Sequence, residues 1–171
     1  MADAIERDVA ALLKLLREMT ELHEQWAELG DAKREALASG DADALTAVCR
    51  LENEKLQAVS EREKRRLELV ASLTRAVKPD AGRPLRLAEL AELMPEPTRG
   101  RLLLARQGLR ERIKVVKTQS SIARRATDSL MKHMNTLVQG VAAAATGAST
   151  YTPRGGTAPR GLTLGTLNTT A

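Results

Sequence analysis

A long heptad pattern in the second half of this 171-residue chain constrains its fold more than any other feature. Small or apolar residues follow one another at alternating steps of four and three, with no proline between Thr98 and Thr152. They are Leu109, Ile113, Val116, Ser120, Ala123, Thr127, Leu130, Met134, Leu137, Val141 and Ala144. This spacing predicts one stripe along a single long helix, facing a partner helix.

The composition also favours helices. Ala, Leu, Glu and Arg dominate, Phe is absent, and the aromatic residues are Trp26 and Tyr151. Ala and Leu are among the best helix formers, whereas a sheet would lack the aromatic and β-branched residues that it packs with. The sequence therefore predicts an all-α fold.

Breaks in the periodic pattern divide the chain into four helices. We expect them at residues 2–38, 42–77, 86–94 and 98–145. The first could loosen at Gly30, and it stops at Gly40, which can form a left-handed cap. Asp41 or Asp43 can cap the second helix. The segment between Pro79 and Pro84 forms a linker, because proline lacks a backbone donor and disfavours helix at the preceding residue.

The length of the last helix determines the expected architecture. Its residues, about 48 in number, would span roughly 70 Å, and alone they would leave the stripe uncovered. We therefore expect an elongated antiparallel three-helix bundle or coiled coil, with the short helix as an addition, over residues 1–145. Residues 146–171 contain few large apolar side chains outside the run Leu162–Leu167, so we expect a disordered, flexible tail.

The net charge of +5 is unevenly distributed. Residues 1–68 carry a net charge of −5 and residues 69–171 a net charge of +10, and no acidic residue follows Asp128. The single cysteine, Cys49, fits a reducing compartment. Because the chain shows neither a signal-peptide pattern nor a long apolar run, we expect a cytoplasmic protein without membrane insertion.

The residues that catalysis or metal binding requires do not converge in the sequence. His23 and His133 fall on different helices without a Cys or second His at ligand spacing, so neither is expected to bind a metal. His23 follows Leu12, Leu16 and Met19 at the same four-three steps on the first helix, so it is expected to be packed or partly exposed, whereas His133 is expected to be solvated. We expect no enzyme, no cofactor and no small-molecule substrate.

The sequence leaves open two further classes of protein, a nucleic-acid-binding protein and a structural scaffold. The long helix carries many basic residues that could neutralise nucleic-acid phosphates, but no aromatic residue is interleaved for base stacking. They are Arg99, Arg101, Arg106, Arg110, Arg112, Lys114, Lys117, Arg124 and Arg125. The other alternative is a structural scaffold that self-associates through the heptad stripe.

Several segments together resemble the FlgN family of flagellar type III export chaperones. The first helix ends in Ala38-Ser39-Gly40-Asp41, and the second continues to Glu52-Asn53-Glu54-Lys55-Leu56. A charged Glu61–Arg66 segment, a proline-marked break and the long last helix follow. The most specific match is Thr150-Tyr151-Thr152-Pro153-Arg154-Gly155, which is similar to a tyrosine-turn-glycine segment after the last helix of the family.

This resemblance implies a cytosolic chaperone that binds the disordered C-terminal segment of the hook-associated (hook–filament junction) proteins. Such a protein prevents premature assembly of its cargo and delivers it to the cytosolic domain of the flagellar export gate. The apolar stripe fits this role independently, because an amphipathic partner helix could dock there and fold on binding. We expect the cargo to contact Leu130, Met134, Leu137, Val138 and Val141. By family position, Tyr151 is implied to dock to the export gate or to the cargo.

Overall fold

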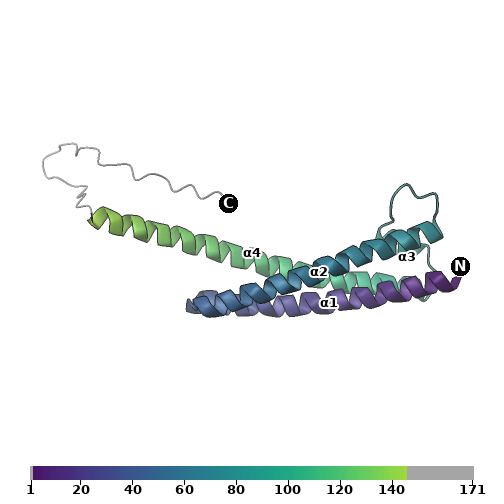
Figure 1. Ribbon diagram of the computed structural model, residues 1–171, viewed down its shortest axis with the longest axis horizontal. Helices are drawn as coiled ribbons and strands as arrows, with labels where there is room; N and C mark the ends of the chain where they lie inside the picture. Colours follow the sequence, from purple (N-terminus) through teal and green to yellow (C-terminus); the bar gives the residue numbers. More distant parts are fainter. Residues whose placement is uncertain (1, 146–171) are drawn as a thin grey trace. The chain divides into compact units, whose positions relative to one another are not determined.

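The computed structural model describes residues 2–145 of the chain, and these residues form four helices (Figure 1). The helices are α1 (Ala2–Ser39), α2 (Ala42–Val77), α3 (Leu87–Glu92) and α4 (Thr98–Ala145), and the described residues include no strand. The all-α prediction is therefore confirmed. None of the four helices has the length and apolar character needed to cross a membrane.

The chain divides into two compact units, Met1–Ser129 and Leu130–Ala171, and α4 contributes residues to both. The first unit contains α1, α2, α3 and the first two thirds of α4. The expected tail at 146–171, which includes Leu162–Leu167, lies outside the described residues, and its flexibility stays a prediction.

α1 and α2 form an antiparallel hairpin around a tight turn (Figure 1). Gly40 takes the left-handed conformation expected of it, with a φ of 71°. Asp41 is the N-cap of α2, and its carboxylate accepts a hydrogen bond of 2.9 Å from the backbone N–H of Ala44. This cap satisfies one of the first backbone donors of α2, which have no partner within the helix.

Polar contacts fix the alignment of α1 against α2 along most of their length. Ser72 Oγ donates to Asp8 at 2.9 Å near one end, and Lys33 pairs with Glu52 at 2.6 Å near the other. Between these contacts, Arg62 of α2 lies 3.6 Å from Glu18 of α1. Residue numbers rise along α1 as they fall along α2, as an antiparallel pair requires.

α4 runs parallel to α1 and antiparallel to α2 within the first unit. Arg112 of α4 pairs with Glu24 of α1 at 2.8 Å. One heptad further along both helices, Gln119 donates to Asp31, also at 2.8 Å. The up–down–up order confirms the antiparallel three-helix bundle that the sequence predicted.

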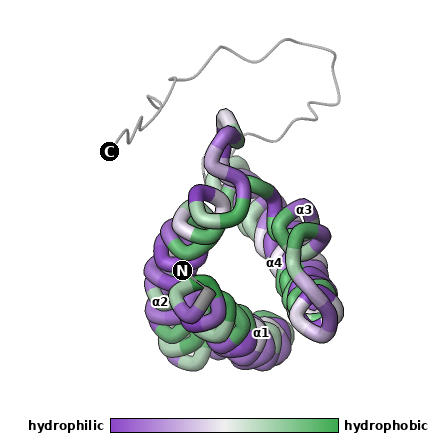
Figure 2. The backbone as a smooth tube through the Cα atoms, turned by 90° about the vertical axis from the view of Figure 1, so that its right-hand side faces the viewer, coloured by the Kyte–Doolittle hydropathy of each residue, from purple (hydrophilic) through white to green (hydrophobic). Residues whose placement is uncertain are grey.

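Leucines from all four helices make the core of the first unit. The side chains of Leu12, Leu16, Leu73, Leu90 and Leu102 are fully buried. Each helix alternates polar and apolar stretches, so that none is apolar all round (Figure 2). Full burial of one such side chain contributes about 1.5–3 kcal/mol, so this cluster is the main source of stability.

The linker between α2 and α4 is held to this core by α3 and by one hydroxyl group. Thr74 Oγ1 donates to the Val70 carbonyl at 2.7 Å and accepts from the Leu85 N–H at 3.0 Å. Leu90 and Ala91 of α3 are completely buried. These contacts position the start of α4 beside the first turns of α1.

Candidate functional site

The apolar stripe of α4 changes its environment along the helix. In the first unit Leu102, Leu109, Val116 and Ala123 recur every seven residues, and all four are buried against the bundle. In the second unit every residue from 130 to 144 is exposed. The heptad pattern therefore continues past the point at which its residues cease to be buried.

The five predicted cargo-contact residues all lie in the exposed part of α4. Leu130, Met134, Leu137, Val138 and Val141, here called the distal stripe, have exposed fractions from 50% to 69%. Steps of four and three place four of them on one helix face, and Val138 lies beside that face. The helix presents a contiguous row of large apolar side chains, which soluble monomers seldom leave uncovered.

The electrostatic surroundings of the distal stripe are simple. Lys132 and His133 are the charged or titratable side chains between residues 130 and 144, and both are exposed, as the sequence predicted for His133. The surface is therefore apolar with a weak basic edge. It can bury apolar area against another helix, and Met134 can adapt its shape to the partner because its thioether chain is unbranched.

The predicted docking residue Tyr151 lies outside the described residues, so its role stays a prediction. The other aromatic residue, Trp26, belongs to α1, and its ring centroid lies 6.1 Å from that of His23. His23 is buried, and its Nδ1 lies 2.6 Å from the Met19 carbonyl oxygen. His23 was expected to be packed or partly exposed, and it is packed.

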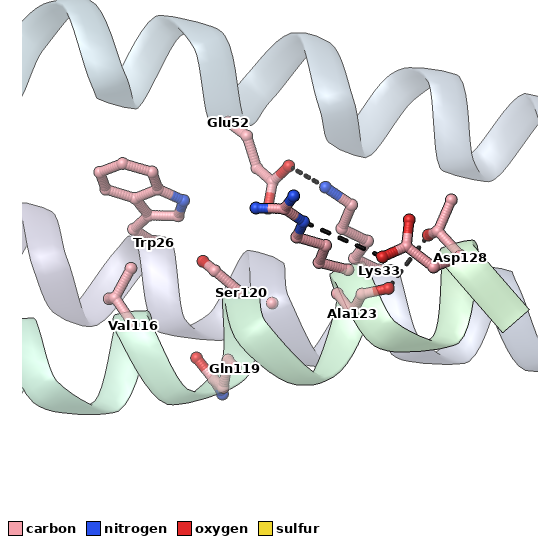
Figure 3. Close-up of a pocket in the computed structure, with 11 residues that line it drawn as sticks. Trp26, Lys33, Glu52, Val116, Gln119, Ser120, Ala123 and Asp128 are labelled. Atoms are coloured by element: carbon pink, nitrogen blue, oxygen red, sulfur yellow. Dashed lines mark hydrogen bonds and ion pairs between the residues drawn. The ribbon is translucent and has the colours of Figure 1, made fainter.

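A pocket of about 280 Å³ lies where α1, α2 and α4 meet, a site that the sequence analysis did not predict, although several of its lining residues belong to the heptad stripe (Figure 3). Trp26 lies at one end, and Lys33 of α1 reaches across to Glu52 of α2. Gln119 of α4 lies directly over Gly30, where an added Cβ would come within 2.9 Å of its Oε1. The pocket is lined by side chains that hold the three helices together.

The Gln119 amide is the most constrained polar group of this pocket. Its Nε2 donates to Asp31, whereas its Oε1 is buried and accepts no hydrogen bond from any described residue. One sequence signal for this site was the glycine within a long helix, because such a glycine often marks a close approach of neighbouring groups. Gly30 does not loosen α1, which is continuous from Ala2 to Ser39.

The residues described by the structure include no group of three or more His, Cys, Asp or Glu side chains arranged to hold a metal ion. Cys49 is a free, half-buried thiol on α2.

Two groups among the basic residues of α4 differ in their surroundings. Arg112 pairs with Glu24 of α1, and Arg99 pairs with Glu92 at 2.6 Å. A second group follows one face of the helix at steps of four and three and lines surface hollows: Arg106, Arg110, Lys114 and Lys117. Sequence reasoning grouped all of these cations together, since it could not see which of them have acidic partners.

Comparison with known families agrees with the helical architecture. A family model described as FlgN protein matches residues 1–159 of the chain, which include all four helices. No curated protein and no solved structure matches the chain.

Proposed function

The chain belongs to the FlgN family of flagellar export chaperones, and from this premise we propose that it binds the C-terminal segment of hook–filament junction proteins. In this proposal the chaperone acts in the cytoplasm, prevents premature assembly of its cargo, and delivers it to the cytosolic domain of the export gate. The observation that carries the proposal is the distal stripe, a row of large apolar side chains exposed on a continuing helix.

The distal stripe supports cargo binding by a simple energetic argument. Burial of apolar surface contributes roughly 25 cal/mol per Å², and the stripe offers five apolar side chains that are at least half exposed. An unstructured cargo segment would gain this contribution by folding into an amphipathic helix on the stripe. The same burial would hide the cargo's own apolar face from other cargo molecules.

The test is a double substitution on the stripe with a control matched in charge. We expect Met134→Glu/Val141→Glu to keep the helicity of the wild type and to abolish capture of the hook-associated protein in a pull-down. Two carboxylates at these positions would have to be desolvated by the cargo helix. The control is Asn135→Glu/Gln139→Glu, which adds the same charge at exposed positions away from the stripe. Unchanged capture by the stripe variant would refute the proposed cargo site.

A self-associating scaffold is the alternative that the same surface favours. In that case the distal stripe would pair with the stripe of a second chain, and light scattering after size exclusion would give a stable dimer. The Met134→Glu/Val141→Glu variant would then be monomeric and the wild type dimeric. A monomeric wild type that captures cargo supports the chaperone.

A further inference from the structure

A groove lies between α2 and α4 in the first unit. It lies on one side of the buried face of α4, and the contacts of α4 with Glu24 and Asp31 lie on the other side. The groove has a volume of about 460 Å³. Leu16 and Met19 of α1 form its floor, and residues 84–87 of the linker and α3 close one end. Three helices of an up–down–up bundle thus leave a position for a fourth, as in four-helix bundles.

The groove is apolar at its base, and its rim carries charged side chains. Leu67 of α2 is 53% exposed at the rim, and Ile113 of α4 is half-buried on the opposite side. Leu109 and Val70 are buried beneath them. An apolar face that the unit's own helices cover incompletely is suited to a further helix laid along it.

The α4 wall is strongly basic. Arg106 and Arg110 line the groove, and Lys114 and Lys117 continue the same face of the helix. Within the part of the chain that the structure describes, none of these four cations has a carboxylate at ion-pair distance. From Arg106 to Lys117 the row extends over roughly 17 Å, or about three helical turns.

The α2 wall does not neutralise this row. Its carboxylate, Glu63, accepts two hydrogen bonds from Arg66, at 2.7 and 2.6 Å. These bonds raise the pKa of Arg66 above its ordinary value. Glu63 is already paired with Arg66, so the charges of Arg86, Arg106 and Arg110 leave the groove with an excess of positive charge. Further along α4, Glu111 lines the hollow that Lys114 and Lys117 also line, and the cations there outnumber it.

We propose that the groove between α2 and α4 binds an amphipathic helix of a partner protein that carries Asp or Glu side chains along the flank facing α4. Its apolar face would cover Leu67 and Ile113, and its acidic flank would pair with the row from Arg106 to Lys117. The tail of this chain does not fit that description, because no acidic residue follows Asp128. The inference is independent of the cargo site, since the groove and the distal stripe share no residue.

The probe is a pair of designed, end-blocked peptides of about 18 residues, long enough to cover the groove. Both carry the same leucine stripe, and their flanks are either all Glu or all Lys. We measure their binding to the full chain by fluorescence anisotropy. We expect the Glu peptide to bind at least tenfold more tightly than the Lys peptide, with a preference that weakens as salt rises, because several exposed ion pairs act together.

Charge reversal of the wall provides the decisive comparison. We expect Arg106→Glu/Arg110→Glu to invert the preference, so that the Lys peptide binds more tightly. Because Arg106 is half-buried, Lys114→Glu/Lys117→Glu at two exposed positions serves as the second variant, and we expect it to shift the preference in the same direction. The matched control is Arg101→Glu/Arg125→Glu, which reverses exposed cations outside the groove and should leave the preference unchanged.

Four outcomes would overturn the proposal. The first is equal binding of the two peptides by the wild type. The second is a change of the peptide preference in the control variant that is as large as the change caused by Arg106→Glu/Arg110→Glu. The third is a wild type that is dimeric and becomes monomeric when the charges of the α4 wall are reversed, because a second copy of the chain would then occupy the groove. The fourth is that the wild type binds a DNA duplex but not the Glu peptide, and that reversing the charges of the α4 wall abolishes the DNA binding. The cations from Arg106 to Lys117 would then bind nucleic acid. Unaltered peptide binding by Met134→Glu/Val141→Glu separates this proposal from the cargo proposal.

Discussion

At the scale of single residues, the contact between Gly30 and Gln119 determines how closely α1 and α4 approach. A Cβ at position 30 would lie 2.9 Å from Gln119 Oε1 and 3.3 Å from Gln119 Cβ. We expect Gly30→Val to lower the free energy of unfolding by about 1–3 kcal/mol, because the added atoms push α4 away and disturb the Gln119–Asp31 hydrogen bond. Urea unfolding followed by circular dichroism measures this change.

The matched control for this prediction is Gly108→Val on α4. Gly108 also lies within a helix, but an added Cβ there would meet no atom within 4 Å. Because Val has a higher helix propensity than Gly, the control should not destabilise the protein. A Gln119→Ala background should restore part of the stability lost with Gly30→Val. Equal effects at positions 30 and 108 would show that α4 does not approach α1 closely at Gly30.

At the scale of elements, the link from α2 to α3 depends on the carboxylate of Glu89. This carboxylate accepts two hydrogen bonds from Arg83 and one of 2.7 Å from the backbone N–H of Arg86. The Arg83 bonds, followed by the Arg86 bond, lower the pKa of Glu89 to about 2. Since the pKa is lower in the folded state, the stabilisation is complete above the unfolded pKa of about 4.3 and is lost as pH falls towards 2.

We therefore expect Glu89→Gln to lower the melting temperature at neutral pH and to reduce its decline between about pH 4.5 and pH 2. The amide cannot be ionised, so this contribution no longer varies with pH. Glu54→Gln, at an exposed position of α2, is the control and should keep the pH profile of the wild type. If thermal unfolding of Glu89→Gln follows the wild-type profile at every pH, the Arg83–Glu89 pair does not stabilise the linker.

The ends of the helices could be predicted from sequence because each depends on local chemistry. Gly40 was expected to take a left-handed conformation, which is confirmed, and Asp41 or Asp43 was expected to cap α2; the N-cap is Asp41. Proline, N-cap and glycine signals act within a few residues, so a sequence shows them directly. The short helix was expected at 86–94 and spans Leu87–Glu92, a difference that is ordinary for helix termini.

The contacts between helices could not be predicted in the same way. The heptad pattern specified which face of α4 is apolar, but it could not show that Gln119 would lie over Gly30. Nor could it show that Arg112 has an acidic partner while Arg110 lines an open groove. These facts depend on the alignment of residues far apart in the chain, which periodicity within one helix does not specify.

At the scale of the whole molecule, the heptad pattern of α4 has buried positions in the first unit and exposed positions in the second. Leu109 and Val116 are buried in the first unit, whereas Leu130 and Leu137, at equivalent heptad positions, are exposed in the second. Helix propensity and the absence of proline keep α4 continuous through both. Stability is therefore concentrated in the core around Leu12 and Leu73, and substitutions in the distal stripe should affect binding far more than folding.

In the proposed function the chaperone both holds its cargo and delivers it, and we propose that different residues perform these two tasks. If the distal stripe binds cargo and Tyr151 docks to the export gate, Tyr151→Ala should reduce secretion of the cargo severalfold while pull-down of the cargo stays near the wild-type level. A tyrosine combines a large apolar ring with a polar hydroxyl, and loss of such an anchor from an interface typically costs about 2 kcal/mol or more.

Tyr151→Phe refines this prediction, because it removes the hydroxyl and keeps the ring. We expect Tyr151→Phe to retain more secretion than Tyr151→Ala if the ring supplies most of the binding energy. The reference is Met134→Glu/Val141→Glu, which should lose capture and secretion together because the cargo is never held. Parallel loss of capture and secretion in Tyr151→Ala would instead place Tyr151 in the cargo site.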